Sequence, residues 1–486
     1  MNRVPELRVR ALNENDLRSD GQYILYWMTA TRRLGWNYSI DRALEYAEKL
    51  RKPLLIFEAL DVGYPWASDR HHQSIISGMK EHRERLESLG TAYYAYIEPQ
   101  SGAGRGLLQA LASRACIVVT DDSPVFFTPR MIESAKRLTY CRVEAVDSCG
   151  LLPIRAADRD FVSAYQFRRF LQRMLPNHLE VSPDPDPLPG ARIPSLPSIP
   201  GEIMERWPLA DTQLLQTQKT LASLPIDHSV GPTPWWGGHA SAEHQLHCFI
   251  AKGLPRYGED RNNPDSGASS GLSPWLHHGH ISPHEIFEAV AESENWTPAH
   301  LSQEIDGRRS GWWGMTPTAE AFLDQLVTWR ELSFVFCSRE ARFDCYDTLP
   351  AWAVKTLEDH AGDPREHVYT LEQFMTSSTH DELWNAAQRQ LMYGGVIHNY
   401  LRMFWGKKIL EWSTHPREAF ETMIELNNRF ALDGRDPNSY TGISWVMGRF
   451  DRGWPERPIY GKVRSMTSSS TRRKLKLDEY LVQWGT

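Results

Sequence analysis

The first 150 residues alternate short apolar runs with amphipathic segments. Helix-like patterns lie near 39–51, 70–89, 103–114 and 129–138, and the apolar runs lie at 23–28, 53–60, 91–97, 116–120 and 142–146. Continuous apolar strands separated by helices are typical of a parallel sheet that is covered on both faces. The pattern therefore predicts a doubly wound α/β domain with a parallel five-stranded sheet. Ligands of such sheets bind at the carboxyl ends of the strands.

The glycines Gly102, Gly104 and Gly106 form a weak dinucleotide-binding signal. They follow the third predicted strand instead of the first, and Leu107 stands where the G-x-G-x-x-G pattern needs its third glycine. The segment is better explained as a loop that leads into a helix.

A proline-rich stretch, VSPDPDPLPGARIPSLPSIP at 181–200, separates this region from the rest of the chain. So many prolines favour an extended, semi-rigid connector. Strand signals fade after about residue 202, and helical patterns dominate from there. We predict an α/β domain over 1–178, a linker over 179–206 and an all-α domain over 207–486.

Bulk properties agree with two domains, because 486 residues are too many for a single core. A hydrophobic content of 41% and a charged content of 24% describe an ordinary soluble protein. No apolar run approaches the ~20 residues that span a bilayer, and the N-terminus lacks the apolar core of a signal peptide. The six cysteines form no C-x-x-C pair, which fits the reducing cytoplasm. We expect a cytoplasmic protein, associated with the nucleoid if the source is bacterial, and separately we expect a monomer.

The net charge of −7 argues against a nucleic-acid partner, but the charge is unevenly distributed. From residue 401 onward the chain carries 15 Lys and Arg against 10 Asp and Glu, a local charge of +5, so the remainder carries −12. A basic C-terminal region allows a phosphate-binding face there. A solvated charged surface explains the same composition.

Three tryptophans, Trp384, Trp405 and Trp412, lie where a one-electron path could run. Thr379 and Glu382 have the spacing of a capping box, which predicts the start of the helix that carries Trp384. A second helix is predicted from about 396 to 412, after the break at 394–395. It places Trp405 and Trp412 on one stripe, two turns and about 10 Å apart. Packing of an aromatic core is the structural alternative.

Histidines are abundant in one region of the chain, but they lack the other ligands of a metal site. The group comprises His239, His244, His247, His277, His278, His280 and His284. Helical spacing could bind zinc, but no nearby cysteine or carboxylate completes a set of ligands. We therefore expect no metal.

Several motifs occur in a characteristic order: YWMTATRR at 26–33, TDDSP at 120–124, VDSCGLLPI at 146–154, SSGLSPWLHHGHIS at 269–282, LRMFWGKKILEW at 401–412, LDGRDPNSYTG at 432–442 and WPERPIYGKVR at 454–464. In this order and spacing they resemble the DNA photolyase/cryptochrome family. Within that family the resemblance is to the class II cyclobutane-pyrimidine-dimer photolyases, and it covers nearly the whole chain.

The resemblance implies FAD, bound in the helical domain. Its phosphate-side contacts match Tyr257, Ser269, Ser270, Leu272 and Ser273, and its flavin-side contacts match Asn399, Arg402, Asn427, Asp433 and Asp436. Asn427 would face the flavin N5, and Arg402 and Asp433 would form an ion pair beside the ring, an environment that stabilises a reduced flavin. Turn chemistry in LNNRFALDGRDPN is the alternative for Asn427 and Asp433. The N-domain could also hold an antenna, a deazaflavin or a folate, and the sequence does not select between them.

The resemblance also implies an electron path, with Trp405 nearest the flavin, Trp384 in the middle and Trp412 outermost. The expected partner is double-stranded DNA that contains pyrimidine dimers, and photolyases are known examples of enzymes that flip bases out of the duplex. Residues that match contacts to the dimer or to the gap in the DNA are Trp329, Met403, Trp445, Arg452 and Trp454. Further cations could hold phosphates or form a solvated tail: Lys462, Arg464, Arg472, Arg473 and Lys474.

Single positions indicate the preferred substrate and mark two departures from the family pattern. Family members that repair (6-4) lesions carry histidines where Asn399 and Met403 stand, which favours cyclobutane dimers here. Gln325 stands at the place of the active-site glutamate, and its amide can donate a hydrogen bond but not a proton. Phe334 and Val335 replace an Asp-Asn pair.

The leading hypothesis is light-driven repair of cyclobutane pyrimidine dimers by electron transfer from excited reduced FAD. A cryptochrome-like blue-light sensor without repair activity is the alternative, motivated by Gln325 and by Phe334 and Val335. A third hypothesis is a nucleotide-binding α/β protein with a helical DNA-binding domain.

Overall fold

The computed structural model describes residues 4–137, 140–211 and 213–485. Its contacts divide the chain into two compact units, each assembled from several segments. Unit 1 comprises Met1–Asp158, Met174–Leu246 and Trp275–Ala289, and unit 2 comprises Arg159–Arg173, His247–Pro274 and Val290–Thr486.

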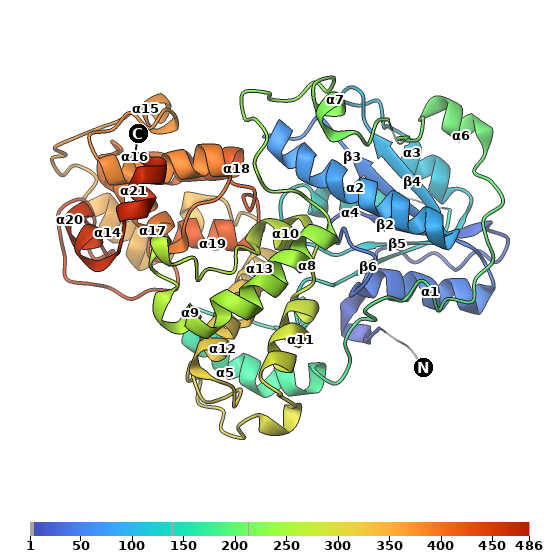
Figure 1. The fold of residues 1–486 in the computed structure, drawn as a ribbon, viewed down its shortest axis with the longest axis horizontal. Coiled ribbons are helices and arrows are strands. Elements are labelled where there is room, and N and C mark those ends of the chain that lie inside the picture. The colour runs from blue at the N-terminus through green and yellow to red at the C-terminus, as the bar shows by residue number, and fades with distance from the viewer. Residues whose placement is uncertain (1–3, 138–139, 212, 486) are drawn as a thin grey trace. The chain divides into compact units, whose positions relative to one another are not determined.

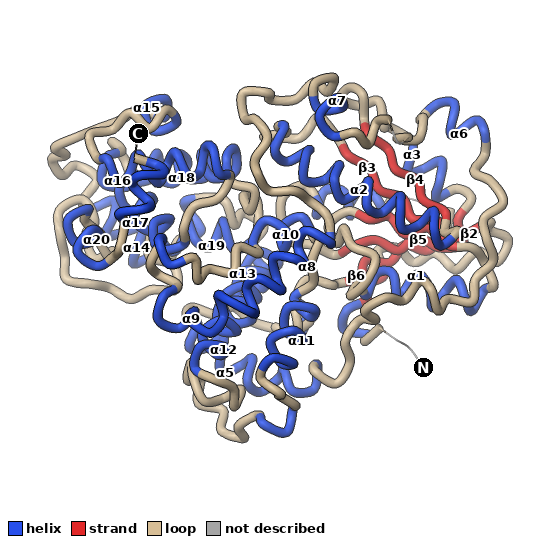
Figure 2. Tube along the Cα trace, viewed as in Figure 1, coloured by secondary structure: helices blue, strands red, loops and turns tan. Residues whose placement is uncertain are grey.

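Unit 1 is built on a six-stranded sheet with the order β1-β6-β5-β2-β3-β4 (Figure 2). The parallel strands are β2 (Tyr23–Met28), β3 (Leu54–Leu60), β4 (Ala92–Ile97), β5 (Ala115–Asp121) and β6 (Arg142–Val146). They coincide with the five predicted strands to within one residue at each end, so the α/β prediction is confirmed. The sixth strand, β1 (Val9–Ala11), pairs antiparallel with β6 and was not predicted.

Helices cover both faces of this sheet, as the buried strands require. On one face the side chains of α1 (Tyr38–Leu50) and α2 (Asp69–Leu89) share a core with Ile24, Ile56 and Ile117. On the other face α3 (Leu107–Ala112), α4 (Thr128–Ala135) and α6 (Gly201–Arg206) pack against Leu25, Leu55 and Val118. The predicted end of the fourth helix at 138 lies outside the described residues. Gly102 and Gly106 have positive φ in the turn that leads into α3, as expected for a loop.

The carboxyl ends of the central strands β2 and β5 are tied together by one buried carboxylate. Asp121 accepts hydrogen bonds from the backbone N–H groups of Thr29, Ala30 and Thr31 at 2.8–2.9 Å, and from the hydroxyl of Ser39 at 2.8 Å. Two of the family-like motifs, at 26–33 and 120–124, thus meet at the point where strand order reverses in this sheet.

The proline-rich residues 181–200 contain no helix or strand, and several apolar side chains from this stretch, such as Leu188 and Leu196, pack against the two cores of the sheet. The domain borders predicted at 179 and 206 fall inside unit 1 and stay a prediction. The remaining helices that lie wholly or mostly in unit 1 are α7 (Thr217–Leu221), α8 (His239–Cys248), α10 (Ser273–His278, whose first two residues belong to unit 2) and α11 (Pro283–Ser293).

Unit 2 is helical, and its described residues contain no β-strand, only an isolated bridge between Arg457 and Gly461 (Figure 1). Its helices are α5 (Ala164–Met174), α9 (Leu254–Asp260), α12 (Pro317–Leu323), α13 (Arg330–Arg339), α14 (Ala351–Asp359), α15 (Leu371–Met375), α16 (Glu382–Arg389), α17 (Asn399–Trp412), α18 (Pro416–Phe430), α19 (Pro437–Val446), α20 (Ser468–Lys474) and α21 (Asp478–Trp484). Short π-helical turns occur at Phe249–Gly253, Asp324–Trp329 and Gln390–Gly394.

The N-cap of the helix that carries Trp384 lies two residues after the predicted N-cap. Asp381, not Thr379, is the N-cap of α16, and its carboxylate accepts from the backbone N–H of Trp384 at 3.0 Å. The hydroxyl of Thr379 instead donates to the side chain of Asn385 at 2.7 Å. The break at Gly394 and Gly395 is confirmed, since Gly395 has a φ of 70° and ends the turn after α16.

Candidate active site

Helices α16 and α17 bring the three predicted electron carriers together. Trp384, Trp405 and Trp412 are all buried, and Trp384 is fully excluded from solvent. The indole N–H of Trp384 donates to the backbone carbonyl of Trp405 at 3.0 Å. Its ring meets that of Trp412 edge-on, with 6.0 Å between ring centroids. Trp384 therefore contacts the backbone of Trp405 and the ring of Trp412, and the electron path through the three residues stays a prediction.

A glutamine that was not predicted orients the innermost indole. Gln388 on α16 is fully buried, and its side-chain oxygen accepts from the indole N–H of Trp405 at 2.8 Å. Its Nε2 is buried and has no hydrogen-bond partner among the described residues. The available signal was its spacing, four residues after Trp384 and hence on the same face of the helix.

The outermost indole is covered by a tyrosine–histidine pair that was also not predicted. The rings of Tyr369 and His380 lie 5.6 and 5.1 Å from that of Trp412, and the phenol oxygen and Nδ1 of His380 share a hydrogen bond of 2.6 Å. Desolvation and the adjacent His367 lower the pKa of His380. The described structure thus places a hydrogen-bonded phenol at the outer end of the tryptophan cluster.

Arg402, Asp433 and Asn427 lie on neighbouring segments, and two of them form the predicted ion pair. Nη2 of Arg402 contacts both carboxylate oxygens of Asp433 at 2.8 and 3.1 Å. Asn427 is 2% exposed, and its Nδ2 is a buried donor without a partner among the described residues, as is Nε of Arg402. The neighbouring Asn428, not Asn427, braces the loop by accepting from the backbone N–H of Arg435 at 3.0 Å. These two unsatisfied donors fit a ligand that is rich in acceptors, such as a flavin.

The predicted phosphate side is a turn with exposed hydroxyl groups. Ser269 and Ser273 are exposed, and Ser270 accepts from the backbone N–H of Leu272 at 3.4 Å. Tyr257 on α9 is buried edge-on against Phe322, with 5.3 Å between ring centroids. Burial raises the pKa of Tyr257 to about 12, so its phenol remains a donor at neutral pH.

Three of the residues predicted to act at the dimer, Gln325, Trp329 and Trp445, lie on or against a π-helical turn. Gln325 and Trp329 both lie on Asp324–Trp329, a rare backbone form that is often found at functional sites. The ring of Trp329 packs against Trp445 at 5.6 Å and 39°, so α19 contributes the second aromatic wall. The side chain of Gln325 makes no hydrogen bond with any described residue, whereas Met403 on α17 is half-buried. Packing of the turn against α19 thus brings together Trp329 and Trp445, two predicted dimer contacts that are distant in sequence.

The remaining predicted residues divide into two groups. Arg452 and Arg464 are exposed and lie 5.5 and 5.0 Å from the ring centroid of the half-buried Trp454. Asp436 caps α19 through the backbone N–H of Asn438 at 2.9 Å, and Asn399 is the exposed first residue of α17.

Within the basic tail the cations already have protein partners. Arg472 pairs with Glu382 at 2.8 Å, Lys474 lies 4.7 Å from the ring of Tyr400, and Arg473 donates to a backbone carbonyl in its own helix. Lys462 contributes backbone contacts to the turn beside Trp454. Their interpretation as phosphate ligands stays a prediction.

Two features are absent from the part of the chain that the structure describes. No group of three or more His, Cys, Asp or Glu side chains in residues 4–137, 140–211 and 213–485 could hold a metal ion. No helix in the same residues is both long enough and apolar enough to cross a bilayer.

Comparison with known proteins adds a second line of observation. A protein named deoxyribodipyrimidine photo-lyase from Methanothermobacter thermautotrophicus is 33% identical over 477 residues, which cover 98% of this chain and 97% of that protein. Proteins of the same name from Potorous tridactylus and Arabidopsis thaliana are 33% and 31% identical and cover 98% and 94% of this chain. These alignments cover 84% and 88% of the respective relatives.

The fold is shared with a solved structure of lower sequence identity. A bacterial class III photolyase from Agrobacterium tumefaciens superposes with a TM-score of 0.69 at 18% identity, over 97% of this chain and 87% of that one. No protein-family model matches the chain.

Proposed function

The chain belongs to the family of deoxyribodipyrimidine photo-lyases, and from this premise we propose that it repairs cyclobutane pyrimidine dimers in DNA with light. The arrangement of Trp384, Trp405 and Trp412 carries the proposal, because the ring of Trp384 packs against that of Trp412 and its indole N–H donates to the backbone carbonyl of Trp405. The helices α16 and α17 that carry these oxidisable side chains also hold buried donors without partners among the described residues, at Gln388 and Arg402. A core that served packing alone would have no need of those donors.

FAD, when bound and reduced, would supply the electron that opens the cyclobutane ring. The residues that would hold it are Arg402, Asn427 and Asp433 at the flavin and the hydroxyl-bearing turn 269–273 at the phosphates. The guanidinium group of Arg402 would stabilise negative charge on the ring, and Asp433 holds that group in place at 2.8 Å.

On the substrate side, Trp329 and Trp445 would form two walls against which the flipped dimer stacks. The amide of Gln325 would donate a hydrogen bond to a carbonyl oxygen of the dimer. Since Gln325 has no partner among the described residues, this hydrogen bond does not require an internal contact to break.

The test is dimer loss on ultraviolet-damaged DNA by the purified holoprotein, in light and in darkness. Loss that requires light supports the proposal, and equal loss under both conditions contradicts it. The Trp405→Phe variant, in the same assay with chemically reduced cofactor, separates repair from the tryptophan path, because only reduction of the cofactor needs that path.

A photosensor without repair activity is the second candidate, and Gln325 is the observation that favours it. An amide cannot deliver a proton to the dimer, so a protein with this residue could keep light-driven reduction of its cofactor and lose repair. Normal photoreduction together with no light-dependent dimer loss would select this function.

A further inference from the structure

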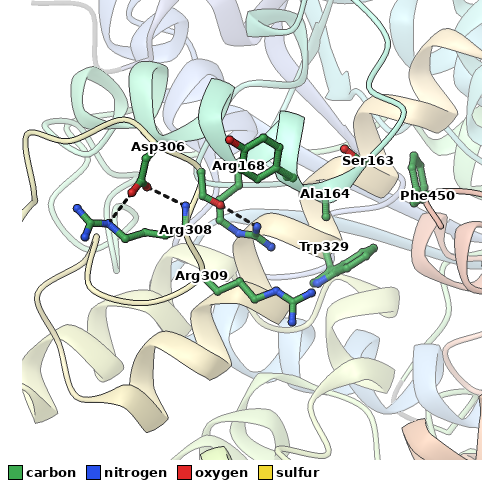
Figure 3. Close-up of a pocket in the computed structure, with 10 residues that line it drawn as sticks. Ser163, Ala164, Arg168, Asp306, Arg308, Arg309, Trp329 and Phe450 are labelled. Carbon is green, nitrogen blue, oxygen red and sulfur yellow. Dashed lines mark hydrogen bonds and ion pairs between the residues drawn. The ribbon is translucent and has the colours of Figure 1, made fainter. Parts of the chain in front are cut away.

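A cavity of about 460 Å³ lies in unit 2 beside the indole of Trp329 (Figure 3). The start of α5, the loop at 306–309, the π-helical turn and Phe450 provide its walls. Trp329 is the only lining residue among the predicted dimer contacts, and none of the predicted FAD contacts or electron carriers lines this cavity. The cavity therefore adjoins the predicted dimer site without being part of it.

Arg309 contributes a positive charge to the lining of the cavity. This side chain is exposed and makes no hydrogen bond or ion pair with any described residue. Figure 3 shows its guanidinium group reaching toward the indole of Trp329. The adjacent Arg308 differs, since it pairs with Asp306 at 3.2 Å and also with Glu304. Arg309 is therefore the lining arginine whose charge is free to bind a ligand.

A second guanidinium group lies buried in the wall. Arg168 is 6% exposed, donates through Nε to Asp324 at 2.9 Å and through Nη1 to the carbonyl of Gly307 at 3.0 Å. Its Nη2 is a buried donor without a partner among the described residues. A buried, hydrogen-bonded guanidinium group with a spare N–H, in the same cavity as an exposed and unpaired one, suits an anion with several oxygen atoms, such as a phosphodiester.

Aromatic surface completes the site. Trp329 uses one side to pack against Trp445 and also lines the cavity, and Phe450 faces the cavity from a backbone with a φ of 60°. Aromatic faces next to guanidinium groups are the usual means of binding single-stranded nucleic acid, because every base can stack and every linkage carries a charge.

We infer that this cavity binds the nucleotide that adjoins the dimer on the damaged strand. Its phosphate contacts Arg309 and Nη2 of Arg168, and its base or sugar lies against Trp329 and Phe450. Continuity with the predicted dimer site supports this occupant, because the indole of Trp329 both packs against Trp445 and lines the cavity. The inference rests on the proposed function in that it takes the dimer to lie between these two tryptophans.

The test compares two ligands of the holoprotein in darkness by fluorescence anisotropy or competition. One is a short single-stranded oligonucleotide with a central dimer, and the other is the isolated dinucleotide dimer, which has no flanking phosphate. The variant is Arg309→Gln. The control is Arg173→Gln, which removes an exposed charge of α5 that does not line the cavity.

We expect Arg309→Gln to weaken binding of the oligonucleotide by about tenfold relative to the dinucleotide. The slope of log affinity against log salt should fall by ~0.7, the value of one phosphate contact on a single strand. A neutral methylphosphonate linkage on one side of the dimer should weaken oligonucleotide binding by the wild type as much as Arg309→Gln does. The same linkage should not weaken binding by the Arg309→Gln variant any further. That side identifies the bound nucleotide as 5′ or 3′.

The inference is overturned if Arg309→Gln and Arg173→Gln lower the affinity for the oligonucleotide equally. It is also overturned if, at both positions of the methylphosphonate, its effect on affinity adds to that of Arg309→Gln. Failure of the proposed function is read separately, as absence of light-dependent dimer loss by the wild type. The binding arm is carried out in darkness and does not depend on that result.

Discussion

Lys407 is a buried cation whose removal should stabilise the protein at low pH. It lies in the middle of α17 with 1% of its surface exposed, and its ammonium group donates to the carbonyl of Val446 at the end of α19. Burial lowers the pKa of Lys407 from 10.5 to about 7. Each pKa unit corresponds to about 1.4 kcal/mol, so below pH 7 the folded state bears a penalty of ~5 kcal/mol for this charge.

The direction in which folding stability changes with pH follows from the number of protons that each state binds. Because the pKa of Lys407 is lower in the folded than in the unfolded state, the unfolded chain binds more protons between about pH 7 and 10.5, and stability rises with pH across this window. At pH 9 the penalty has fallen to ~2 kcal/mol. Lys407→Met removes the titration at the cost of one hydrogen bond, ~1 kcal/mol. The variant should therefore gain ~4 kcal/mol at pH 6 and ~1 kcal/mol at pH 9.

Urea unfolding of wild type and variant at the two pH values measures this difference. Lys408→Met is the matched control, since its ammonium group is paired with Glu411 at 2.7 Å and its loss should destabilise instead. An advantage of Lys407→Met that stays constant or grows between pH 6 and pH 9 would refute the reasoning, because only a depressed pKa makes the advantage shrink.

Three further outcomes are expected. Trp405→Phe should leave the absorbance of oxidised flavin unbleached under blue light, because a phenyl ring is far harder to oxidise than an indole; bleaching at the wild-type rate would contradict the path. Gln325→Glu should keep or raise the quantum yield of repair, and a large loss would mean that Gln325 does not contact the dimer. Arg168→Met should strand the buried carboxylate of Asp324 and cost ~3–5 kcal/mol in urea unfolding, and Arg168→Met with Asp324→Leu should recover part of this loss.

The five parallel strands could be predicted from sequence because burial on both faces leaves an unbroken apolar run for each. Strand β1 could not, since Val9–Ala11 is three residues long and has no periodicity. It is held at the edge of the sheet by its pairing with β6 and by Arg10, which contacts Asp122 at 2.7 Å. Such long-range contacts leave no local pattern.

The candidate site shows the same division. The spacing of Trp405 and Trp412 on one helix is local and was predictable, whereas the placement of Trp384 between them depends on how α16 packs against α17. The cap of α16 was predicted wrongly because Thr379 and Asp381 can both accept from a backbone N–H, and spacing alone does not decide between them. Tyr369 reaches Trp412 from a segment outside any helix, with no signal in the sequence.

The two departures from the family pattern differ in their surroundings, and this bears on the choice between repair and sensing. Phe334 and Val335 lie on α13 with 6% and 3% of their surfaces exposed, and the guanidinium group of Arg330 lies 4.3 Å from the ring of Phe334. They therefore act as core residues of this helix, and their effect on function has to pass through packing. Gln325 instead has an amide without a partner, on the same π-helical turn as Trp329. Of the two departures, Gln325 is thus the one that can act directly on a bound dimer, and the argument for a sensor depends on it alone.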